Sequence, residues 1–255
     1  MRQNRFILIL LVIGILSCNQ GDKTSEETAE VITDGWQVST PGAEGFDQQK
    51  FTAVIEKLPS DNPKLDGIVI ARHGKLIADY YYNGYSADKI HKIWSITKSV
   101  TGTTLGIAID QGLLSEHNSI DAYLSEYLED DTSLIRSITI EHLITMTSGF
   151  EWTELGGPTS SNFKLAYSKD WIEFVLGQPM IRPPGTVYNY STGNTLLLAP
   201  IIKKATGKQV SDFAQKHLFK ALQITNYEWD RQSEFWSKTQ GGELPGGKEP
   251  TKIQY

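Results

Sequence analysis

The pattern of apolar and polar residues divides the chain into a strand-rich segment and a longer helical segment. Between Leu65 and Tyr85, two runs rich in β-branched and aromatic residues, GIVIA and LIADYYY, flank a short polar stretch. Two such runs joined by a few polar residues with a glycine are typical of a β-hairpin. We therefore predict two antiparallel strands that turn at Arg72-His73-Gly74-Lys75.

Helices are predicted on both sides of this hairpin. Asp47 is a favourable N-cap for a helix through FTAVIEKL. After the hairpin, capping residues and glycines delimit further helices, expected over residues 95–111, 121–128, 139–146, 171–176, 194–205 and 211–222. A hairpin of two strands is marginally stable alone, and no strong strand pattern follows residue 200. The pattern indicates an α+β fold whose sheet lacks partners in this chain.

The first residues resemble an export signal rather than part of the fold. A basic stretch over residues 1–5 precedes the unbroken apolar run FILILLVIGIL. Eleven residues are too few to span a bilayer as a helix, but they suit the apolar region of a secretory signal. We therefore assign residues 1–17 to a signal peptide.

The single cysteine of the chain, Cys18, follows this run directly in the sequence LSC. This context resembles the lipobox of bacterial lipoproteins, in which the cysteine is lipidated and becomes the first mature residue. An ordinary signal peptide followed by an unpaired cysteine is the alternative. The resemblance implies an exported lipoprotein, membrane-anchored through Cys18 on the periplasmic side or the cell surface.

The next segment, residues 18–45, is polar and rich in Gly, Ser, Thr and Glu, which predicts a flexible tether. Residues 46–255 then form the folded domain. The net charge of −6 provides no basic surface for nucleic acid. The histidines are scattered, and Glu141-His142 lacks the second histidine of a zinc site. We expect no metal and no cofactor.

The candidate chemistry lies in the sequence WSITKSVTG, where Ser95 and Lys98 are three residues apart. On a helix this spacing places both side chains on one face, so Lys98 can remove the proton that makes a serine hydroxyl a poor nucleophile. The lysine must be neutral to do so, which burial and the helix dipole favour. A packed, inward-facing helix is indicated by its neighbours Ile96, Val100, Gly102, Leu105 and Ile107. A helix cap followed by a solvated lysine is the structural alternative.

Several further motifs, in order, resemble the serine β-lactamase and penicillin-binding-protein-like hydrolases, especially the branch with class C β-lactamases, esterases and the 6-aminohexanoate-dimer hydrolase. The matching stretches cover about residues 45–230: the hairpin with its HGK turn, SITKS, ITIEHL followed by MTSG, PGTVYNYS, LLLAPIIKKATGK and HLFKALQIT. The resemblance implies the β-lactamase/transpeptidase-like fold, in which an antiparallel sheet with flanking helices accompanies an all-helical subdomain.

The resemblance also implies roles for three residues. Ser95 would form an acyl-enzyme, Lys98 would help to deprotonate it, and Tyr190 would share the proton transfer, with Tyr188 as its nearest rival. The backbone N–H of Ser95 would supply half of the oxyanion hole. The substrate would be a small ester, amide or peptide.

Two departures from the family pattern change these expectations. The class C pattern is Tyr-x-Asn, but Thr192 occupies the third position, and Asn194 is expected to serve as a helix cap. This difference favours an esterase or an amidase over a β-lactamase. The late strand motif, Lys or His followed by any residue and Gly, is not found after Tyr190. We therefore expect the C-terminal strands to be missing from this chain, and the 255 residues alone to fold poorly or to be inactive.

Three functions remain open from the sequence. The first is a serine hydrolase that cleaves a small ester or amide. The second is a catalytically inactive, lipid-anchored binding protein on the same scaffold. The third is a D-Ala-D-Ala carboxypeptidase or β-lactamase.

Overall fold

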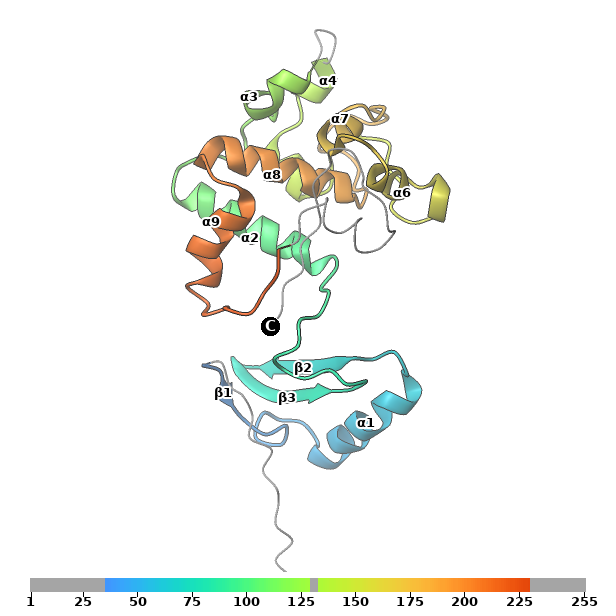
Figure 1. Ribbon diagram of the computed structural model, residues 1–255, viewed down its shortest axis with the longest axis vertical. Helices are drawn as coiled ribbons and strands as arrows, with labels where there is room; N and C mark the ends of the chain where they lie inside the picture. Colours follow the sequence, from blue (N-terminus) through green and yellow to red (C-terminus); the bar gives the residue numbers. More distant parts are fainter. Residues whose placement is uncertain (1–34, 129–132, 230–255) are drawn as a thin grey trace, which may run out of the picture.

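A computed structural model describes residues 35–128 and 133–229 (Figure 1). A small sheet with one helix beside it forms one end of the molecule, and a group of helices forms the other. The strands are β1 (Gln37–Val38), β2 (Gly67–Arg72) and β3 (Lys75–Tyr81). Cys18 and the whole predicted signal peptide lie outside the described residues.

The predicted hairpin is confirmed. Strands β2 and β3 pair antiparallel, and Arg72 lies opposite Lys75, so His73 and Gly74 alone make the turn. Both turn residues have positive φ, 50° for His73 and 73° for Gly74. This is the backbone of a type I′ turn, whose twist matches that of the flanking strands.

The start of the domain differs from the sequence-based expectation. Residues 37–38, assigned to the flexible tether, form β1 and pair with β3, and this pairing is parallel, so the sheet is mixed rather than purely antiparallel. The Glu44 carboxylate, also within the predicted tether, is buried and accepts hydrogen bonds from Ser39 (2.7 Å) and Lys75 (2.8 Å). The polar composition of this segment did not reveal the contacts, because the pairing of β1 and the hydrogen bond from Lys75 both depend on strand β3 being in place.

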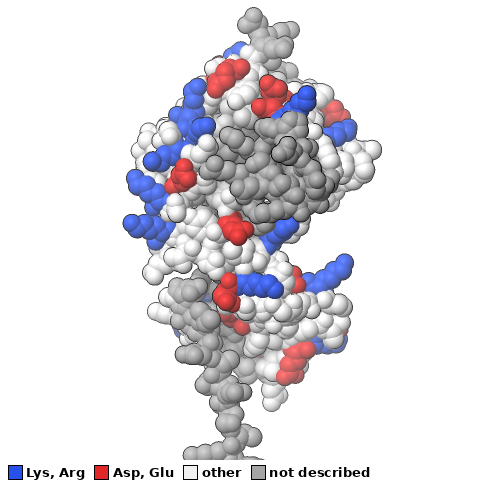
Figure 2. Space-filling view, in the orientation of Figure 1, with Lys and Arg blue, Asp and Glu red and all other residues white. Residues whose placement is uncertain are grey.

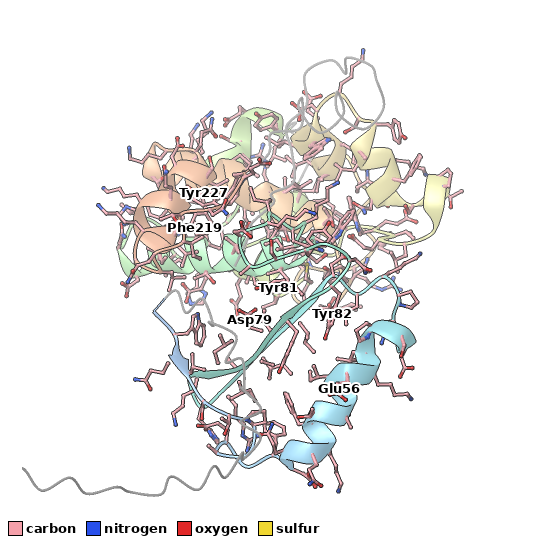
Figure 3. All side chains as sticks on the ribbon, turned by 60° about the horizontal axis from the view of Figure 1, so that its bottom comes forward. Glu56, Asp79, Tyr81, Tyr82, Phe219 and Tyr227 are labelled. Atoms are coloured by element: carbon pink, nitrogen blue, oxygen red, sulfur yellow. The ribbon has the colours of Figure 1, made fainter. Side chains whose placement is uncertain are left out.

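Helix α1 (Gln48–Asp61) lies beside the sheet. Its N-cap is Asp47, as predicted, and the Asp47 carboxylate accepts from the Lys50 N–H at 3.0 Å. The Tyr82 hydroxyl, just after β3, donates to the Ile55 carbonyl of α1 at 3.5 Å (Figure 3).

The helical part follows the predicted order of elements, with differences at the ends. The elements are α2 (Ile96–Asp110), α3 (Asp121–Leu124), η1 (Ser125–Tyr127), α4 (Ser133–Arg136), α5 (Ile140–Ile144), η2 (Gly157–Thr159), α6 (Ser161–Ala166), α7 (Trp171–Leu176), α8 (Thr192–Thr206), α9 (Val210–Ala214) and the π-helical η3 (Gln215–Phe219). Helix α7 has its predicted bounds. Helices α4 and α6 were not predicted from the sequence.

Helix α8 is the centre of the main hydrophobic core. It contacts α2, α3, α5, α6, α7 and α9. Its residues Leu197, Ile201 and Ile202 are fully buried with Leu105 of α2 and Leu143 of α5. The core therefore fixes the relative positions of α2 and the loop before α8, which carry the predicted site residues.

A smaller core joins the start of α2 to the last described helices. Ile93 packs with Ala214 and Phe219, and the rings of Phe219 and Tyr227 lie 4.6 Å apart (Figure 3). The segment before α2 also contacts the sheet end, where the His91 ring lies 2.8 Å from the Asp66 carboxylate.

Charged side chains of both signs are distributed over the visible surface. On the face in Figure 2, the Lys and Arg side chains are interspersed with Asp and Glu side chains and separated by uncharged areas. Within residues 35–128 and 133–229, no helix has the length and apolar character needed to cross a membrane.

Candidate active site

Ser95 and Lys98 lie at the first turn of α2. Ser95 is the N-cap residue, its side chain makes no capping hydrogen bond, and it is exposed. Lys98 Nζ lies 3.2 Å from Ser95 Oγ, which is hydrogen-bond distance. The hydroxyl is therefore free of the capping role that the structural alternative assigns to it, and an amine is within reach.

Tyr190 comes from the loop before α8, and the structure brings it to the same place. Lys98 Nζ lies 5.0 Å from the centroid of the Tyr190 ring, within the range of a cation–π contact. One amine thus contacts the Ser95 hydroxyl on one side and the Tyr190 ring on the other. Tyr188, the rival candidate, is 65% exposed.

The backbone around Ser95 leaves a donor available. The N–H groups of Ile96 and Thr97 donate to the carbonyls of Ile93 and Trp94 at 3.0 Å each, whereas the Ser95 N–H donates to no acceptor within the part of the chain that the structure describes. An N–H at a helix start can stabilise a developing negative charge. The geometry of Ser95 is therefore compatible with half of an oxyanion hole.

Trp94 was not predicted as part of this site. It directly precedes Ser95, has a φ of 47° and is 74% exposed. Few residues other than glycine adopt a positive φ, and such positions concentrate at functional sites. No sequence signal marks a backbone conformation of this kind.

The environment of α2 is more open than the sequence predicted. We expected a helix packed inward, with Ile96 and Val100 among its buried residues. Leu105 is fully buried as expected and Val100 packs partly buried against the smaller core, whereas Ile96 is 45% exposed. The first turn of α2 is therefore partly exposed, and the helix is anchored by buried residues from Thr101 onwards.

Asn194 does not cap α8, which corrects the sequence-based expectation. Ser191 is the N-cap and accepts from the Asn194 N–H at 3.2 Å. The Asn194 side chain is fully buried in the first turn and accepts from Ser148 Oγ at 2.8 Å. The capping residue lies earlier because α8 begins two residues before the predicted start.

Thr192, at the place of the family asparagine, is held by Glu154. Its backbone N–H donates to Glu154 Oε2 at 2.9 Å, and its hydroxyl donates to Glu154 Oε1. The half-buried Glu154 was not predicted from the sequence, because a single acidic residue in a polar loop belongs to no recognisable pattern.

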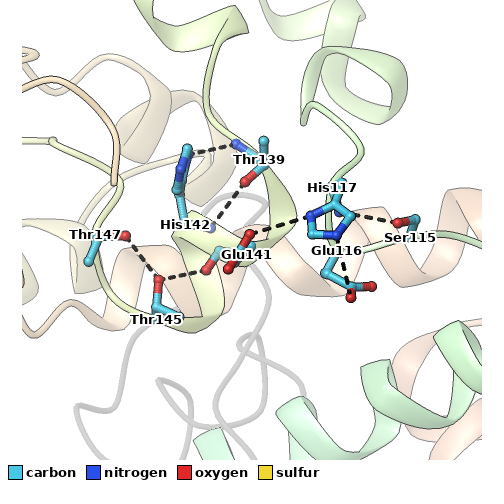
Figure 4. A network of polar contacts seen from close by, with 8 residues as sticks. All are labelled: Ser115, Glu116, His117, Thr139, Glu141, His142, Thr145 and Thr147. Atoms are coloured by element: carbon cyan, nitrogen blue, oxygen red, sulfur yellow. Dashed lines mark hydrogen bonds and ion pairs between the residues drawn. The ribbon is translucent and has the colours of Figure 1, made fainter. Parts of the chain in front are cut away.

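A network of polar contacts surrounds α5 (Figure 4), and the chain after α5 holds the loop that leads to Tyr190. Thr139 and His142 form a reciprocal capping box, in which His142 Nδ1 accepts from the Thr139 N–H at 3.1 Å. The chain after α5 then accepts two hydrogen bonds of 2.8 Å, from Gly185 N–H to Thr147 O and from Asn189 N–H to Met146 O. His142 thus has a structural role.

Comparisons with known proteins identify the family of the chain. A family model described as Beta-lactamase matches residues 56–253. The chain is 26% identical over 212 residues to Protein flp of Staphylococcus aureus (strain MW2), covering 78% of this chain and 42% of that protein. It is 23% identical over 191 residues to 6-aminohexanoate-dimer hydrolase of Paenarthrobacter ureafaciens, covering 68% and 47%. The chain therefore spans less than half of the length of these curated relatives.

Solved structures show the same fold. The structure of a β-lactamase/D-alanine carboxypeptidase from Pseudomonas syringae aligns with a TM-score of 0.54 and 26% identity, over 68% of this chain and 49% of that chain. The predicted β-lactamase/transpeptidase-like α+β fold is thus confirmed. With the family model matching most of its length, the chain belongs to the β-lactamase family, within the serine β-lactamase and penicillin-binding-protein-like group.

Proposed function

We propose that this protein is a serine hydrolase that cleaves a small ester or amide through an acyl-enzyme on Ser95. The observation that carries the proposal is the position of the Lys98 amine, 3.2 Å from Ser95 Oγ and 5.0 Å from the Tyr190 ring centroid. A nucleophile within hydrogen-bond distance of a base, with a third group in contact with that base, is the arrangement that covalent catalysis requires.

The proposed reaction has two halves. Ser95 Oγ attacks the carbonyl carbon while the Lys98 amine, acting with Tyr190, takes the hydroxyl proton. The Ser95 N–H stabilises the oxyanion, and the alcohol or amine leaves with a proton returned by the same pair. Water then attacks the acyl-enzyme by the reverse proton route and releases the acid. Because the Lys98 amine contacts the Tyr190 ring, we assign the proton transfer to the two residues together.

Thr192 supports a small ester or amide over a β-lactam. Both of its hydrogen-bonding groups are directed to Glu154, and a threonine offers no side-chain amide to a substrate carbonyl. The carboxypeptidase activity in the name of the Pseudomonas syringae structure belongs to that protein, and for this chain it is an outcome of the test.

Hydrolysis by the full-length protein tests the proposal. We expect turnover of p-nitrophenyl butyrate or of the linear 6-aminohexanoate dimer, abolished in Ser95→Ala and retained in Ser99→Ala. Ser99 is a matched control because it is exposed on the same helix one turn later. Equal turnover in Ser95→Ala would contradict the proposal. Ligand binding with no turnover by the parent would favour the inactive binding protein, and release of D-Ala from a peptide ending in D-Ala-D-Ala would favour the carboxypeptidase.

We also propose that the protein is exported and tethered to a membrane by lipid on Cys18. The support comes from the sequence alone, in the apolar run that ends at LSC. More than one acyl chain is needed for stable anchoring. We expect the parent to partition into detergent and Cys18→Ser to partition into the aqueous phase. The same aqueous partition for both would contradict the anchor.

A further inference from the structure

The loop that carries Tyr190 is fastened on both sides of the tyrosine to one short segment, residues 152–154. Before Tyr190, the Asn189 amide donates to the Trp152 carbonyl at 3.0 Å. After it, Thr192 donates both its N–H and its hydroxyl to the Glu154 carboxylate. Tyr190 therefore lies between two attachment points to the same segment, which we call the 152–154 clamp.

The 152–154 clamp is itself fixed to the core. The Trp152 ring is 5% exposed and packs edge-on against Phe174, with centroids 6.4 Å apart. Its indole N–H donates to Glu154 Oε2 at 2.7 Å. The same ring lies against the start of α8, where a Cβ added to Gly193 would come within 2.8 Å of it. A residue larger than glycine at 193 would push the two segments apart.

Glu154 is the central group of this arrangement. Its two oxygens accept three hydrogen bonds: from the Trp152 indole, the Thr192 N–H and the Thr192 hydroxyl. The Thr192 N–H is one of the donors that a helix start leaves without an intrahelical partner, and the positive end of α8 favours a carboxylate there. The carboxylate is thus held by donors from both segments at once.

We infer that Glu154, through Thr192 and Trp152, is the positioning residue that keeps the Tyr190 ring against Lys98. The expected effect on catalysis rests on the proposed function. The expected effect on the position of the Tyr190 ring does not depend on it. Glu154 touches neither the substrate nor the reacting atoms in this scheme. It acts by fixing the loop on which Tyr190 stands.

A matched pair of substitutions separates positioning from charge. In Glu154→Gln, the amide oxygen can accept from Trp152 and the Thr192 N–H, while its NH₂ donates to the Thr192 hydroxyl, so all three contacts persist without the charge. Glu154→Met keeps the length of the side chain and removes every acceptor. We expect the rate at which a fluorophosphonate phosphonylates the full-length protein to fall about tenfold or more in Glu154→Met and to stay within about threefold of the parent in Glu154→Gln.

A double-mutant cycle tests whether the effect passes through Tyr190. If Glu154 acts by placing this ring, then Glu154→Met should cause no further loss in a Tyr190→Phe background, because the group that it positions no longer transfers a proton. The assays run at a temperature at which each variant is fully folded by circular dichroism. Losses that multiply in the double variant would overturn the inference and leave Glu154 as a helix cap only.

Crystal structures of the two variants decide the point independently of activity. We expect the Tyr190 ring to stay near its 5.0 Å distance from Lys98 Nζ in Glu154→Gln and to move away in Glu154→Met. An unmoved ring in Glu154→Met would overturn the inference. If the parent is not acylated at Ser95, the proposed function fails, while these structures still determine whether the 152–154 clamp positions Tyr190.

Discussion

At the scale of single residues, the site depends on one lysine that contacts two groups from distant parts of the sequence. The proximity of the Ser95 and Lys98 side chains was predictable because a helix places residues three apart on one face. Tyr190 was predictable only through its motif, since its approach to Lys98 is a tertiary contact. Glu154 and the positive φ of Trp94 could not be predicted, because neither hydrogen-bond partners nor backbone angles are encoded in a local pattern.

Gly149 offers a residue-scale prediction. Its φ is 89°, and an added Cβ would overlap the carbonyl oxygen of Arg182, whose N–H donates to the Gly149 carbonyl at 3.3 Å. We expect Gly149→Ala to lower the free energy of unfolding by about 2 kcal/mol or more, measured by urea denaturation. Gly106 lies inside α2 with no atom within 4 Å of an added Cβ, so Gly106→Ala should raise stability by about 0.5–1 kcal/mol. Unchanged stability in Gly149→Ala would contradict the described packing.

At the scale of elements, the hairpin and the long helices were predictable because each carries its own signal. The turn at His73-Gly74 and the caps at Asp47 and Thr139 act locally, so the sequence alone indicated them. Strand β1 has two residues and exists because β3 offers a free edge, and Glu44 is buried because Ser39 and Lys75 surround it. Contacts of this kind depend on the completed hairpin, which explains why the tether was predicted to extend too far.

The Glu44 cluster predicts how stability depends on pH. Hydrogen bonds from Lys75 above all, then Ser39 and His73, lower the pKa of Glu44 from 4.5 to about 2. A carboxyl with a lowered folded-state pKa stabilises the fold above its unfolded value, and this contribution disappears as pH falls from 4.5 towards 2. We expect the melting temperature of the parent to fall more steeply over this range than that of Glu44→Gln.

Glu56→Gln is the control for this experiment. Glu56 is an exposed residue of α1, so its substitution should leave the pH profile of the parent unchanged. Parallel profiles for the parent and Glu44→Gln would show that the carboxylate does not fasten the start of the domain to the hairpin.

At the scale of the whole molecule, the site is assembled from segments of the helical part that only the core around α8 brings together. The start of α2 supplies Ser95 and Lys98, and the loop before α8 supplies Tyr190. The two helices are held together by one core, to which α2 contributes Leu105 and α8 contributes Ile201. The family, and with it the fold, was predictable because many motifs occur in a fixed order. The open first turn of α2 was not, since the pattern of apolar residues alone placed Ile96 inside.

The central claim is that Ser95 is the nucleophile, and peptide mapping of the full-length protein after treatment with a fluorophosphonate tests it most directly. Mass spectrometry should locate the phosphonyl adduct on the peptide that contains Ser95. The adduct should be absent in Ser95→Ala and slow to form when the Lys98 amine is removed in Lys98→Met. An adduct on another residue, or equal labelling of Ser95→Ala, would contradict the account.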